Sequence, residues 1–293
     1  MAAIRSILTA TDLSSRSGEA VLRAARTARE TGAAVHLLHV LRPGPWEWLR
    51  HQLTDPPADL ATRLSEAARY RLEELAHAMA REHGVTPAVR CAEGDVLEEI
   101  GRAIEDTAAD LLVIGARGGG AARHLLLGST AERMLAQARC AILVVRHPAE
   151  VRYRNVLVPV DLTETSVTAL RLAQALAPEG RIHALHAFEA PEEDRLRVAG
   201  LAEEDLRDYI EAAGKDASRR MADLLQQLPA DPPVDGQVLH GHPLSHTLDQ
   251  QEELACQLVV VGQGSGSRVD DFLLGSVSRR VLAQSKGDVL MVA

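Results

Sequence analysis

The stretch ILTATDLS (residues 7–14) is an apolar run that ends in an aspartate, and it recurs later in the chain as VLVPVDLT (156–163). Further pairs follow in the same order: VHLLHV (35–40) and IHALHA (182–187), DLLVIG (110–115) and QLVVVG (257–262), LLLGS (125–129) and FLLGS (272–276), ERMLAQ (132–137) and RRVLAQ (279–284). An ordered repeat of about 147 residues indicates two copies of one domain. We expect domains at 1–149 and 150–293, with a boundary near RHPAEVRYR (146–154).

Short β-branched runs alternate with helical patterns inside each copy. In the first copy we expect strands near residues 4–11, 34–40, 86–92, 110–115 and 141–146, and helices near 15–31, 57–83, 95–108 and 129–138. The strands are continuously apolar, which predicts burial of both faces of each strand. The alternation predicts an α/β fold in which each copy is a doubly wound, Rossmann-like sheet of five parallel strands. In such sheets the ligand crevice lies beyond the carboxyl ends of the strands, at the switch point.

The longest helical pattern has one apolar face. Pro56-Pro57 and Gly84 mark its two ends. The residues expected on the buried face are Leu60, Leu64, Ala68, Leu72, Leu75 and Met79.

Composition excludes several classes of protein. The chain has 293 residues, of which 46% are apolar and 25% charged, as in a globular protein of about two domains. Its net charge of −9 argues against a nucleic-acid partner, which needs a basic surface. The charge is uneven, because residues 1–150 hold 18 basic and 19 acidic side chains and residues 151–293 hold 14 and 22.

The remaining composition points to the cytoplasm. No apolar run approaches the roughly 18 residues of a membrane span, and the first residues lack the pattern of a signal peptide, so we expect no membrane association. Three widely spaced cysteines, Cys91, Cys140 and Cys256, suggest reduced core thiols rather than a disulfide framework or a CxxC metal or redox site.

The glycine-rich stretch GARGGGAARHLLLGST (115–130) follows the fourth expected strand, which places it at the crevice. Gly115 and Gly118 permit close approach of the backbone to a ligand. Gly128, Ser129 and Thr130 open the next helix, whose free N–H groups and dipole favour an anion. The usual nucleotide motifs, GxxxxGK[ST] and a GxGxxG at the first βα turn, are absent. On composition alone, this stretch could therefore be either a polyphosphate cradle or a flexible connection between strand and helix.

The spacing of the glycines favours a polyphosphate cradle over a flexible connection. The pattern G-x2-G-x9-G-[ST], formed by Gly115, Gly118, Gly128 and Ser129, resembles the ATP-binding motif of universal stress proteins of the UspA type. ILTATDLSS (7–15), LLHV (37–40) and LLLGSTAERML to AILVVR (125–146) are similar to the first strand, the second strand and the closing helix and strand of that family. The resemblance covers both halves, so the chain resembles a tandem universal stress protein.

The resemblance implies a fold of the adenine nucleotide alpha hydrolase-like class and pairing of domains through their last strands, within the chain or in a homodimer. It also implies ATP as ligand, or AMP or ADP, with Mg²⁺ as an accompanying ion. Asp12 and Val40 would meet the adenosine end, and the loop and helix would surround the ribose and phosphates. The binding residues implied in the first copy are Ala10, Thr11, Asp12, Val40, Gly115, Arg117, Gly118, Gly128, Ser129 and Thr130.

The second copy departs from the motif. Ser265 replaces the second glycine, and Asp270-Asp271 stand where the first copy has Arg123-His124. Acidic side chains oppose a phosphate at short range, and Arg268 offsets only part of this. We therefore expect tighter ATP binding in the first copy. Weaker candidates in the second copy are Asp161, Ala187, Gly262, Gly264, Gly275 and Ser276.

Other motifs have structural interpretations. His36/His39 and His183/His186 form two HxxH pairs, but strand residues three apart point to opposite faces, which favours core or interface histidines over a metal site. The cluster His240, His242 and His246 lacks a recognisable ligand set, and its role is open. Residues 43–57, with both tryptophans, could form a lid, contact a partner or pack beneath the long helix, and 189–211 is an acidic, solvated stretch.

No catalytic residues are predicted. Neither a Ser-His-Asp elbow nor an SGGxDS loop is present, and Asp12 and Asp161 are expected to orient a ligand. The leading hypothesis is a cytoplasmic, ATP-binding stress-response sensor or adaptor with a protein partner. The alternatives are a regulatory scaffold that binds no nucleotide and an enzyme that uses ATP, including a slow ATPase.

Overall fold

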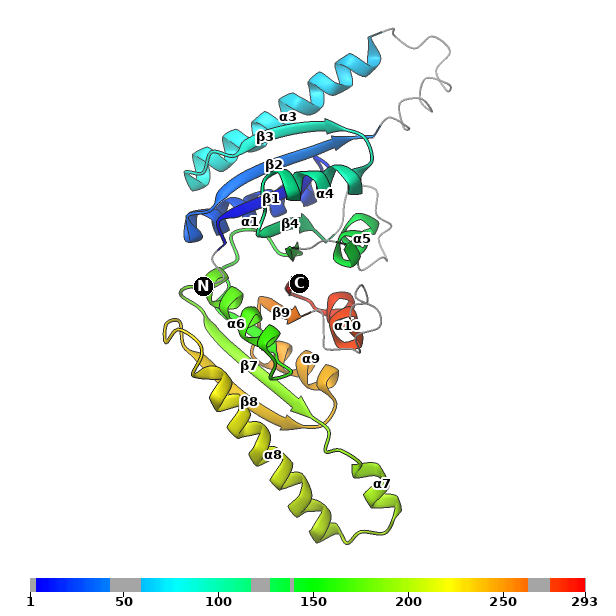
Figure 1. The fold of residues 1–293 in the computed structure, drawn as a ribbon. Coiled ribbons are helices and arrows are strands. Elements are labelled where there is room, and N and C mark those ends of the chain that lie inside the picture. The colour runs from blue at the N-terminus through cyan, green and yellow to red at the C-terminus, as the bar shows by residue number, and fades with distance from the viewer. Residues whose placement is uncertain (1–3, 43–58, 117–126, 138–139, 263–274, 293) are drawn as a thin grey trace. The chain divides into compact units, whose positions relative to one another are not determined.

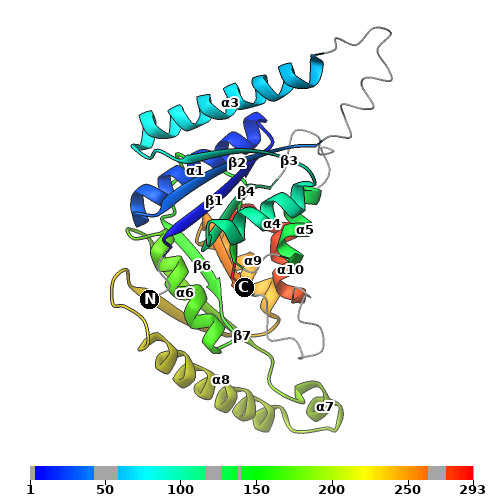
Figure 2. The same cartoon turned by 45° about the horizontal axis from the view of Figure 1, so that its top comes forward.

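The computed structural model describes residues 4–42, 59–116, 127–137, 140–262 and 275–292. The chain divides into an N-terminal unit, Ala3–Val151, and a C-terminal unit, Arg152–Val292. In each unit the described residues form a parallel sheet with helices on both faces (Figures 1 and 2). The segment 43–57, for which a lid, partner or packing role was expected, lies outside the described residues, and so does the expected helix start at Pro56-Pro57. Residues 117–126 and 263–274 also lie outside them.

The N-terminal unit has the predicted doubly wound topology. Its strands are β1 (Ser6–Thr11), β2 (Ala34–Leu41), β3 (Ala88–Glu93), β4 (Leu111–Gly115) and β5 (Ala141–Val145). Its helices are α1 (Ser15–Thr31), α3 (Leu60–His83), α4 (Val96–Asp106) and α5 (Ser129–Gln137). The strand order is β3-β2-β1-β4-β5, and the pairs with a described register are parallel. α1 packs against α3, and α4 packs against α5, so each pair forms one covering layer.

The C-terminal unit repeats this plan. Its strands are β6 (Asn155–Pro159), β7 (Arg181–Phe188), β8 (Val234–His240), β9 (Leu258–Gly262) and β10 (Asp288–Val292), in the order β10-β9-β6-β7-β8. Its helices are α6 (Glu164–Leu176), α7 (Glu193–Val198), α8 (Glu203–Leu225), α9 (Pro243–Glu253) and α10 (Ser276–Gln284). The acidic stretch 189–211 is helix and loop, as predicted, and α7 has no buried residues.

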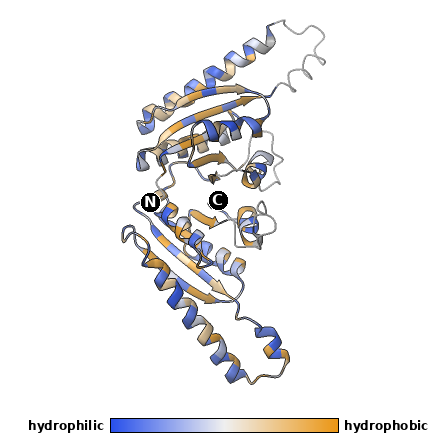
Figure 3. Ribbon diagram, viewed as in Figure 1, coloured by the Kyte–Doolittle hydropathy of each residue, from blue (hydrophilic) through white to orange (hydrophobic). Residues whose placement is uncertain are grey.

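The core of each unit lies on the inner strands. Leu8 of β1 and Leu111 and Leu112 of β4 are at most 1% exposed. The prediction that both faces of every strand are buried is wrong for β3, where Ala88, Val89 and Arg90 are exposed. β3 is the outermost strand of its sheet and has a neighbouring strand on one side only, so its cover is incomplete. Figure 3 shows hydrophobic residues concentrated on the strands and hydrophilic ones along the outer helices.

The long helix α3 buries half of the residues predicted for its apolar face, and Leu64 and Leu75 of that face are half-buried. Ala68, Leu72 and Met79 are buried, and Leu72 and Met79 have no exposed surface. The helix ends at Gly84, which adopts a left-handed φ of 69° and donates its N–H to the carbonyl of Ala80. A glycine takes this conformation at little cost, which explains the sharp end of the helix.

A hydrogen-bond pattern repeats at the amino ends of the first strands. Asp110 accepts the backbone amides of Arg5 and Ser6 at 2.8 and 3.0 Å. Gln257 does the same for the first residues of the second copy, at 2.8 and 2.9 Å. The two units are therefore copies in their hydrogen bonding as well as in their topology. Among the described helices, none has both the length and the apolar character that crossing a bilayer requires.

Thr9 lowers the stability of β1, and the second copy has no such residue at the equivalent position. Its side chain is 0% exposed, and its hydroxyl has no hydrogen-bond partner among the described residues. Val158 occupies the equivalent position of β6. Replacing Thr9 with valine should raise the free energy of unfolding by about 1 kcal/mol, because an unpaired hydroxyl leaves the core. Urea unfolding followed by tryptophan fluorescence measures this, since both tryptophans belong to residues 1–150.

The reciprocal variant Val158→Thr is the control for that measurement. It places a hydroxyl in the 0% exposed environment of Val158 and should lower the stability of the C-terminal unit by a similar amount, about 1 kcal/mol. Residues 151–293 contain no tryptophan, so far-UV circular dichroism follows the urea unfolding of this variant and of the wild type. A Thr9→Val protein less stable than the wild type would contradict this account of Thr9.

Candidate functional site

The switch point of the N-terminal sheet lies between β1 and β4, because the strand order runs outward from β1 to β2 and β3 and then returns to β4. Thr9 pairs with Val113 of β4, and Thr11 pairs with His39 of β2. The carboxyl ends of β1, β2 and β4 therefore lie at one edge of the sheet. Ligands of doubly wound sheets bind at this place.

The turn after β1 presents Asp12 at that edge. Asp12 is exposed, and its Oδ1 accepts the N–H and hydroxyl of Ser14 at 3.0 and 2.6 Å. Thr11 is buried, and its hydroxyl bonds that of Ser17 at 2.8 Å and accepts the amide of Leu13 at 3.0 Å. Leu13 has a left-handed φ of 62°, which costs a non-glycine residue on the order of 1 kcal/mol. The turn is thus held in one strained conformation by its own hydroxyl groups.

A histidine that the sequence pattern did not assign to the site fastens this turn to β2. His39 is buried, and its Nδ1 lies 2.8 Å from the carbonyl oxygen of Thr11. The second copy repeats the contact between His186 Nδ1 and the carbonyl of Val160 at 2.8 Å. Because a carbonyl only accepts, the histidine Nδ1 carries the proton and donates it. The recurrence of HxxH in both copies was the available signal for this role, and the interpretation as core histidines is confirmed for His39.

His183, the first histidine of the second HxxH pair, is half-buried on β7. Burial lowers the pKa of His183, and the nearby Asp235 carboxylate raises it in part. The net lowering favours the neutral ring.

The glycine stretch begins and ends at the same point of the edge. The amide of Ala116 donates to the carbonyl of Val145, and the amide of Gly128 donates to the carbonyl of Ala116, both at 2.8 Å. Helix α5 starts at the next residue, and its first helical bond joins Glu132 N to Gly128 O at 3.0 Å. The amides of the first turn thus have no partner within the helix and lie next to β4.

The described candidate residues of the first copy gather at this edge. Ala10 and Val40 are half-buried near the carboxyl ends of β1 and β2, and Gly115 is the last residue of β4. Ser129 is exposed and Thr130 half-buried in the first turn of α5. The candidates and loop residues that lie outside the described part of the chain are Arg117, Gly118, Arg123, His124, Gly264, Ser265, Arg268, Asp270 and Asp271.

The second copy builds its first turn in a related way. Asp161 Oδ1 accepts the amide and hydroxyl of Thr163 at 3.2 and 2.5 Å and the hydroxyl of Ser166 at 2.7 Å. Leu162 repeats the left-handed φ, at 61°. Val160 stands where the first copy has Thr11, so the hydroxyl of Ser166 turns to the aspartate instead of a threonine.

The helix after the second glycine stretch differs in its first turn. Gly275 is the N-cap of α10, with φ −53° and ψ 151°, and Ser276 begins the helix. Val277 replaces the hydroxyl-bearing Thr130 of the first copy. Ser278 donates its hydroxyl to the carbonyl of Gly262, the last residue of β9, at 2.6 Å. Ala187, the remaining candidate, is half-buried near the end of β7.

The histidine cluster of the second copy occupies the end of β8 and the start of α9. His240 Nε2 lies 2.7 Å from Glu193 Oε2, and His246 Nε2 lies 3.0 Å from the backbone oxygen of His240. His242 is the N-cap residue of α9. No group of three or more His, Cys, Asp or Glu residues in the described ranges is arranged to hold a metal ion. The contacts of His240 and His246 link α7, β8 and α9.

The cysteines are free thiols. Burial raises the pKa of Cys140 to about 11 and that of Cys256 to about 12, and it also raises the pKa of Cys91. The three thiols therefore stay protonated at neutral pH and are poor nucleophiles and metal ligands.

Comparison with known proteins agrees with the topology and the repeat. The model of the universal stress protein family matches residues 3–146 and again residues 152–293. This chain belongs to the universal stress protein family. The family resemblance expected from the glycine spacing and the strand motifs is confirmed, and so is the tandem α/β fold.

Two universal stress proteins match nearly the whole length of this chain. A universal stress protein of Mycolicibacterium smegmatis is 29% identical over 98% of this chain and 96% of its own length. The crystal structure of a universal stress protein from Archaeoglobus fulgidus has a TM-score of 0.66 and 23% identity, over 98% of this chain and 97% of that one. Another solved universal stress protein is in complex with cAMP; it is 24% identical and matches 49% of this chain and 98% of its own, with a TM-score of 0.38.

The N-terminal edge has two chemically distinct ends. At one end Asp12 supplies an exposed carboxylate that accepts hydrogen bonds. At the other, the first turn of α5 supplies amides, the helix dipole and the hydroxyls of Ser129 and Thr130, all of which suit an anion. Such an edge fits a ligand that carries hydroxyl or amine groups at one end and phosphates at the other.

Proposed function

We propose that this universal stress protein binds an adenine nucleotide, ATP foremost, at the carboxyl edge of its N-terminal sheet, and that it works as a cytoplasmic stress-response sensor or adaptor. The supporting observation is the convergence of Asp12 and the first turn of α5 at the switch point between β1 and β4. The three free cysteines agree with a reducing compartment.

Different residues would bind the two ends of the nucleotide. Asp12 and the backbone at Val40 would hold the adenosine end, while the first-turn amides of α5 and the hydroxyls of Ser129 and Thr130 would hold phosphates. The bound phosphates supply negative charge that the helix dipole stabilises. Because one ligand would contact both β1 and α5, its binding favours a single arrangement of the edge. A protein partner that recognises this arrangement would then report the presence of ATP.

The N-terminal unit is the better nucleotide site of the two. The C-terminal unit replaces Thr130 with Val277 and uses the hydroxyl of Ser278 to tie α10 to Gly262. It also carries most of the chain's excess of acidic side chains. Both differences weaken attraction for a polyphosphate.

Titration of the full-length protein with ATP tests the proposal. We expect one nucleotide per chain in calorimetry, and a stabilisation of about 1.4 kcal/mol when free ATP is ten times its dissociation constant. CTP at the same concentration is the control for general phosphate binding and should stabilise less. Mass spectrometry of the denatured protein checks for nucleotide retained during purification.

Three outcomes would contradict the proposal. If millimolar ATP does not stabilise the protein and no nucleotide is retained during purification, the results favour a scaffold that acts by protein association alone. Equal binding of CTP would remove the adenine specificity. Turnover with release of AMP or pyrophosphate would make the protein an enzyme rather than an adaptor.

A further inference from the structure

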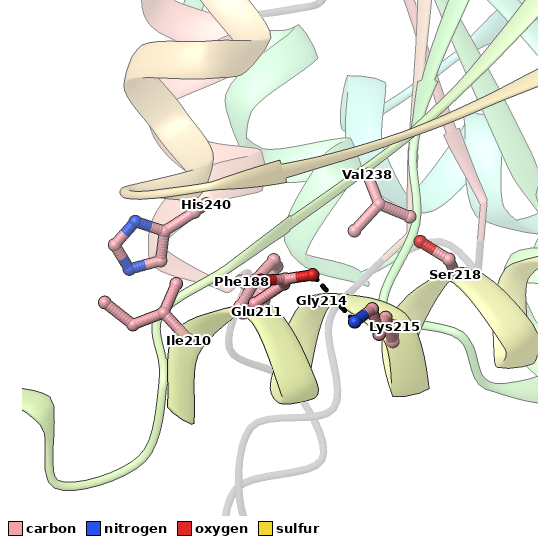
Figure 4. A pocket seen from close by; sticks show the side chains of 8 residues that line it. All are labelled: Phe188, Ile210, Glu211, Gly214, Lys215, Ser218, Val238 and His240. Carbon is pink, nitrogen blue, oxygen red and sulfur yellow. Dashed lines mark ion pairs between the residues drawn. The ribbon is translucent and has the colours of Figure 1, made fainter. Parts of the chain in front are cut away.

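A groove of about 460 Å³ lies in the C-terminal unit between α8 and the carboxyl-terminal parts of β7 and β8 (Figure 4). Its volume falls in the range of small-molecule sites. It is separate from the candidate nucleotide residues of this unit, since neighbouring strand residues such as Ala187 and Phe188 face opposite sides of the sheet. The lining residues are Phe188, Ile210, Glu211, Gly214, Lys215, Ser218, Val238 and His240.

The helix that lines the groove, α8, carries a glycine at the centre of its buried face. In α3 the face consists of Leu64, Ala68, Leu72, Leu75 and Met79; in α8 residues of the same spacing are Leu206, Ile210, Gly214, Ala217 and Met221.

Leu72 has no exposed surface, whereas at Gly214 the ring of Phe188 takes the space that a side chain would need. A Cβ atom on Gly214 would lie 3.3 Å from Cζ of Phe188, so the ring edge lies directly beside the glycine. The C-terminal unit thus has a glycine with an aromatic ring against it where the N-terminal unit has a packed leucine, and both Gly214 and Phe188 line the groove.

The floor and one end of the groove are apolar or aromatic. Phe188, Ile210 and Val238 contribute the hydrocarbon surface. The rings of Phe188 and His240 lie 5.4 Å apart and are tilted by 56°, and His240 is held in place by Glu193 at 2.7 Å. Aromatic side chains in this arrangement favour a flat apolar ligand, because they offer both faces and edges for contact.

The other end carries hydrogen-bond donors. Lys215 Nζ pairs with Glu211 Oε1 at 2.7 Å, and both side chains are largely exposed. The Glu211 carboxylate raises the pKa of Lys215, which therefore stays charged at neutral pH. Ser218 lies one turn further along α8, and its hydroxyl has no hydrogen bond to the described residues. An exposed ion pair is weak, so a ligand anion can take the place of Glu211 on Lys215 at small cost.

We propose that this groove binds a small amphipathic carboxylic acid with a flat, aromatic body. The body lies over Phe188, Ile210 and Val238, and the carboxylate accepts hydrogen bonds from Lys215 and Ser218. The site is independent of ATP binding, which would give this universal stress protein a second ligand on its C-terminal unit.

Lysine labelling provides a direct test, because the chain has only two lysines, Lys215 and Lys286. Lys286 pairs with Glu252 at 3.2 Å and is equally exposed, so it serves as an internal control. The full-length protein is acetylated with trace reagent in increasing 2-naphthoate, and each site is measured by peptide mass spectrometry. With about 13 non-hydrogen atoms, this probe should bind with a dissociation constant on the order of 1 mM.

We expect acetylation of Lys215 to slow about tenfold at ten times the dissociation constant, with no change at Lys286. ATP should change neither rate, so the result does not depend on nucleotide binding. 2-Naphthamide, which has the same shape without the charge, should protect Lys215 at least about tenfold more weakly. Equal slowing at both lysines, no slowing at either, or equal protection by the amide would overturn the proposal.

Two variants locate the ligand in the groove, read out by 2-naphthoate fluorescence. Gly214→Leu places a side chain against the Phe188 ring, which has to move out of the groove lining, and should abolish binding. Ser218→Glu removes a donor and, together with Glu211, makes the charge at this end of the groove net negative, so it should weaken binding at least about tenfold, while its exposed position protects folding. Ala212→Glu adds the same charge at an exposed position of α8 outside the lining and should bind as the wild type does. If the folded Ser218→Glu protein binds 2-naphthoate as tightly as the wild type does, the proposed site is wrong.

Discussion

Replacing Arg23 with leucine should destabilise the N-terminal unit by about 3 kcal/mol. Arg23 is a charged side chain on α1 that is only 2% exposed. Its Nη1 donates to the carbonyl of Val151 at 2.8 Å and its Nη2 to the carbonyl of Pro148 at 3.0 Å. The leucine variant loses two charge-assisted hydrogen bonds and leaves two carbonyls without these donors.

The same segment is held by two more side chains of α1. Arg26 donates to the carbonyls of Ala149 and Glu150, both at 3.1 Å, and Glu19 accepts the amide of Ala149 at 2.8 Å. Three charged residues of one helix thus fasten the end of the N-terminal unit. The equivalent positions of α6 are Thr168, Leu172 and Ala175, so the second copy tolerates leucine at the Arg23 position.

Urea unfolding monitored by tryptophan fluorescence measures the loss, because Trp46 and Trp48 belong to the N-terminal half. Arg29→Leu is the matched control, since Arg29 lies on the same helix but is exposed, and it should change stability by less than about 0.5 kcal/mol. If Arg23→Leu changes stability as little as the control does, the bonds to Pro148 and Val151 are not stabilising and the interpretation fails.

Local patterns predicted most of the fold. The recurrence of ILTATDLS and DLLVIG, with apolar strands between helical patterns, was sufficient for two copies of a doubly wound sheet. Gly84 marked the end of α3 because its φ is one that glycine takes freely. β3 was misjudged because an apolar run does not reveal whether its strand is central or at the edge of a sheet.

The position of the candidate site was predictable from the sequence, but the contacts that hold its residues in place were not. A strand end followed by aspartate located Asp12, yet the bond between His39 and the carbonyl of Thr11 joins two strands and depends on their register. The left-handed conformation of Leu13 has no local signal, because leucine is rarely found there. The groove beside Gly214 required the comparison of α8 with α3 in their buried faces.

Changing Asp12 to alanine should weaken ATP binding by the N-terminal unit about thirtyfold, which corresponds to about 2 kcal/mol. Asp12 is the exposed carboxylate at the switch point, and an ionised acceptor forms stronger hydrogen bonds to a ligand than a neutral one. The turn around it is fixed by Thr11, Ser14 and Ser17, so the carboxylate meets the ligand without first having to be ordered. Calorimetry on the full-length protein gives the change in the dissociation constant.

The internal repeat supplies the control for this experiment. Asp161→Ala makes the same change at the equivalent turn of the C-terminal unit, and it should leave the affinity and the stoichiometry of ATP binding unchanged if the nucleotide binds in the N-terminal unit. Asp12→Asn keeps an oxygen for the amide of Ser14, so a loss of affinity in this variant isolates the charge from the shape of the turn. Equal losses from Asp12→Ala and Asp161→Ala would show that both units bind ATP, and a loss from Asp161→Ala alone would place the nucleotide in the C-terminal unit.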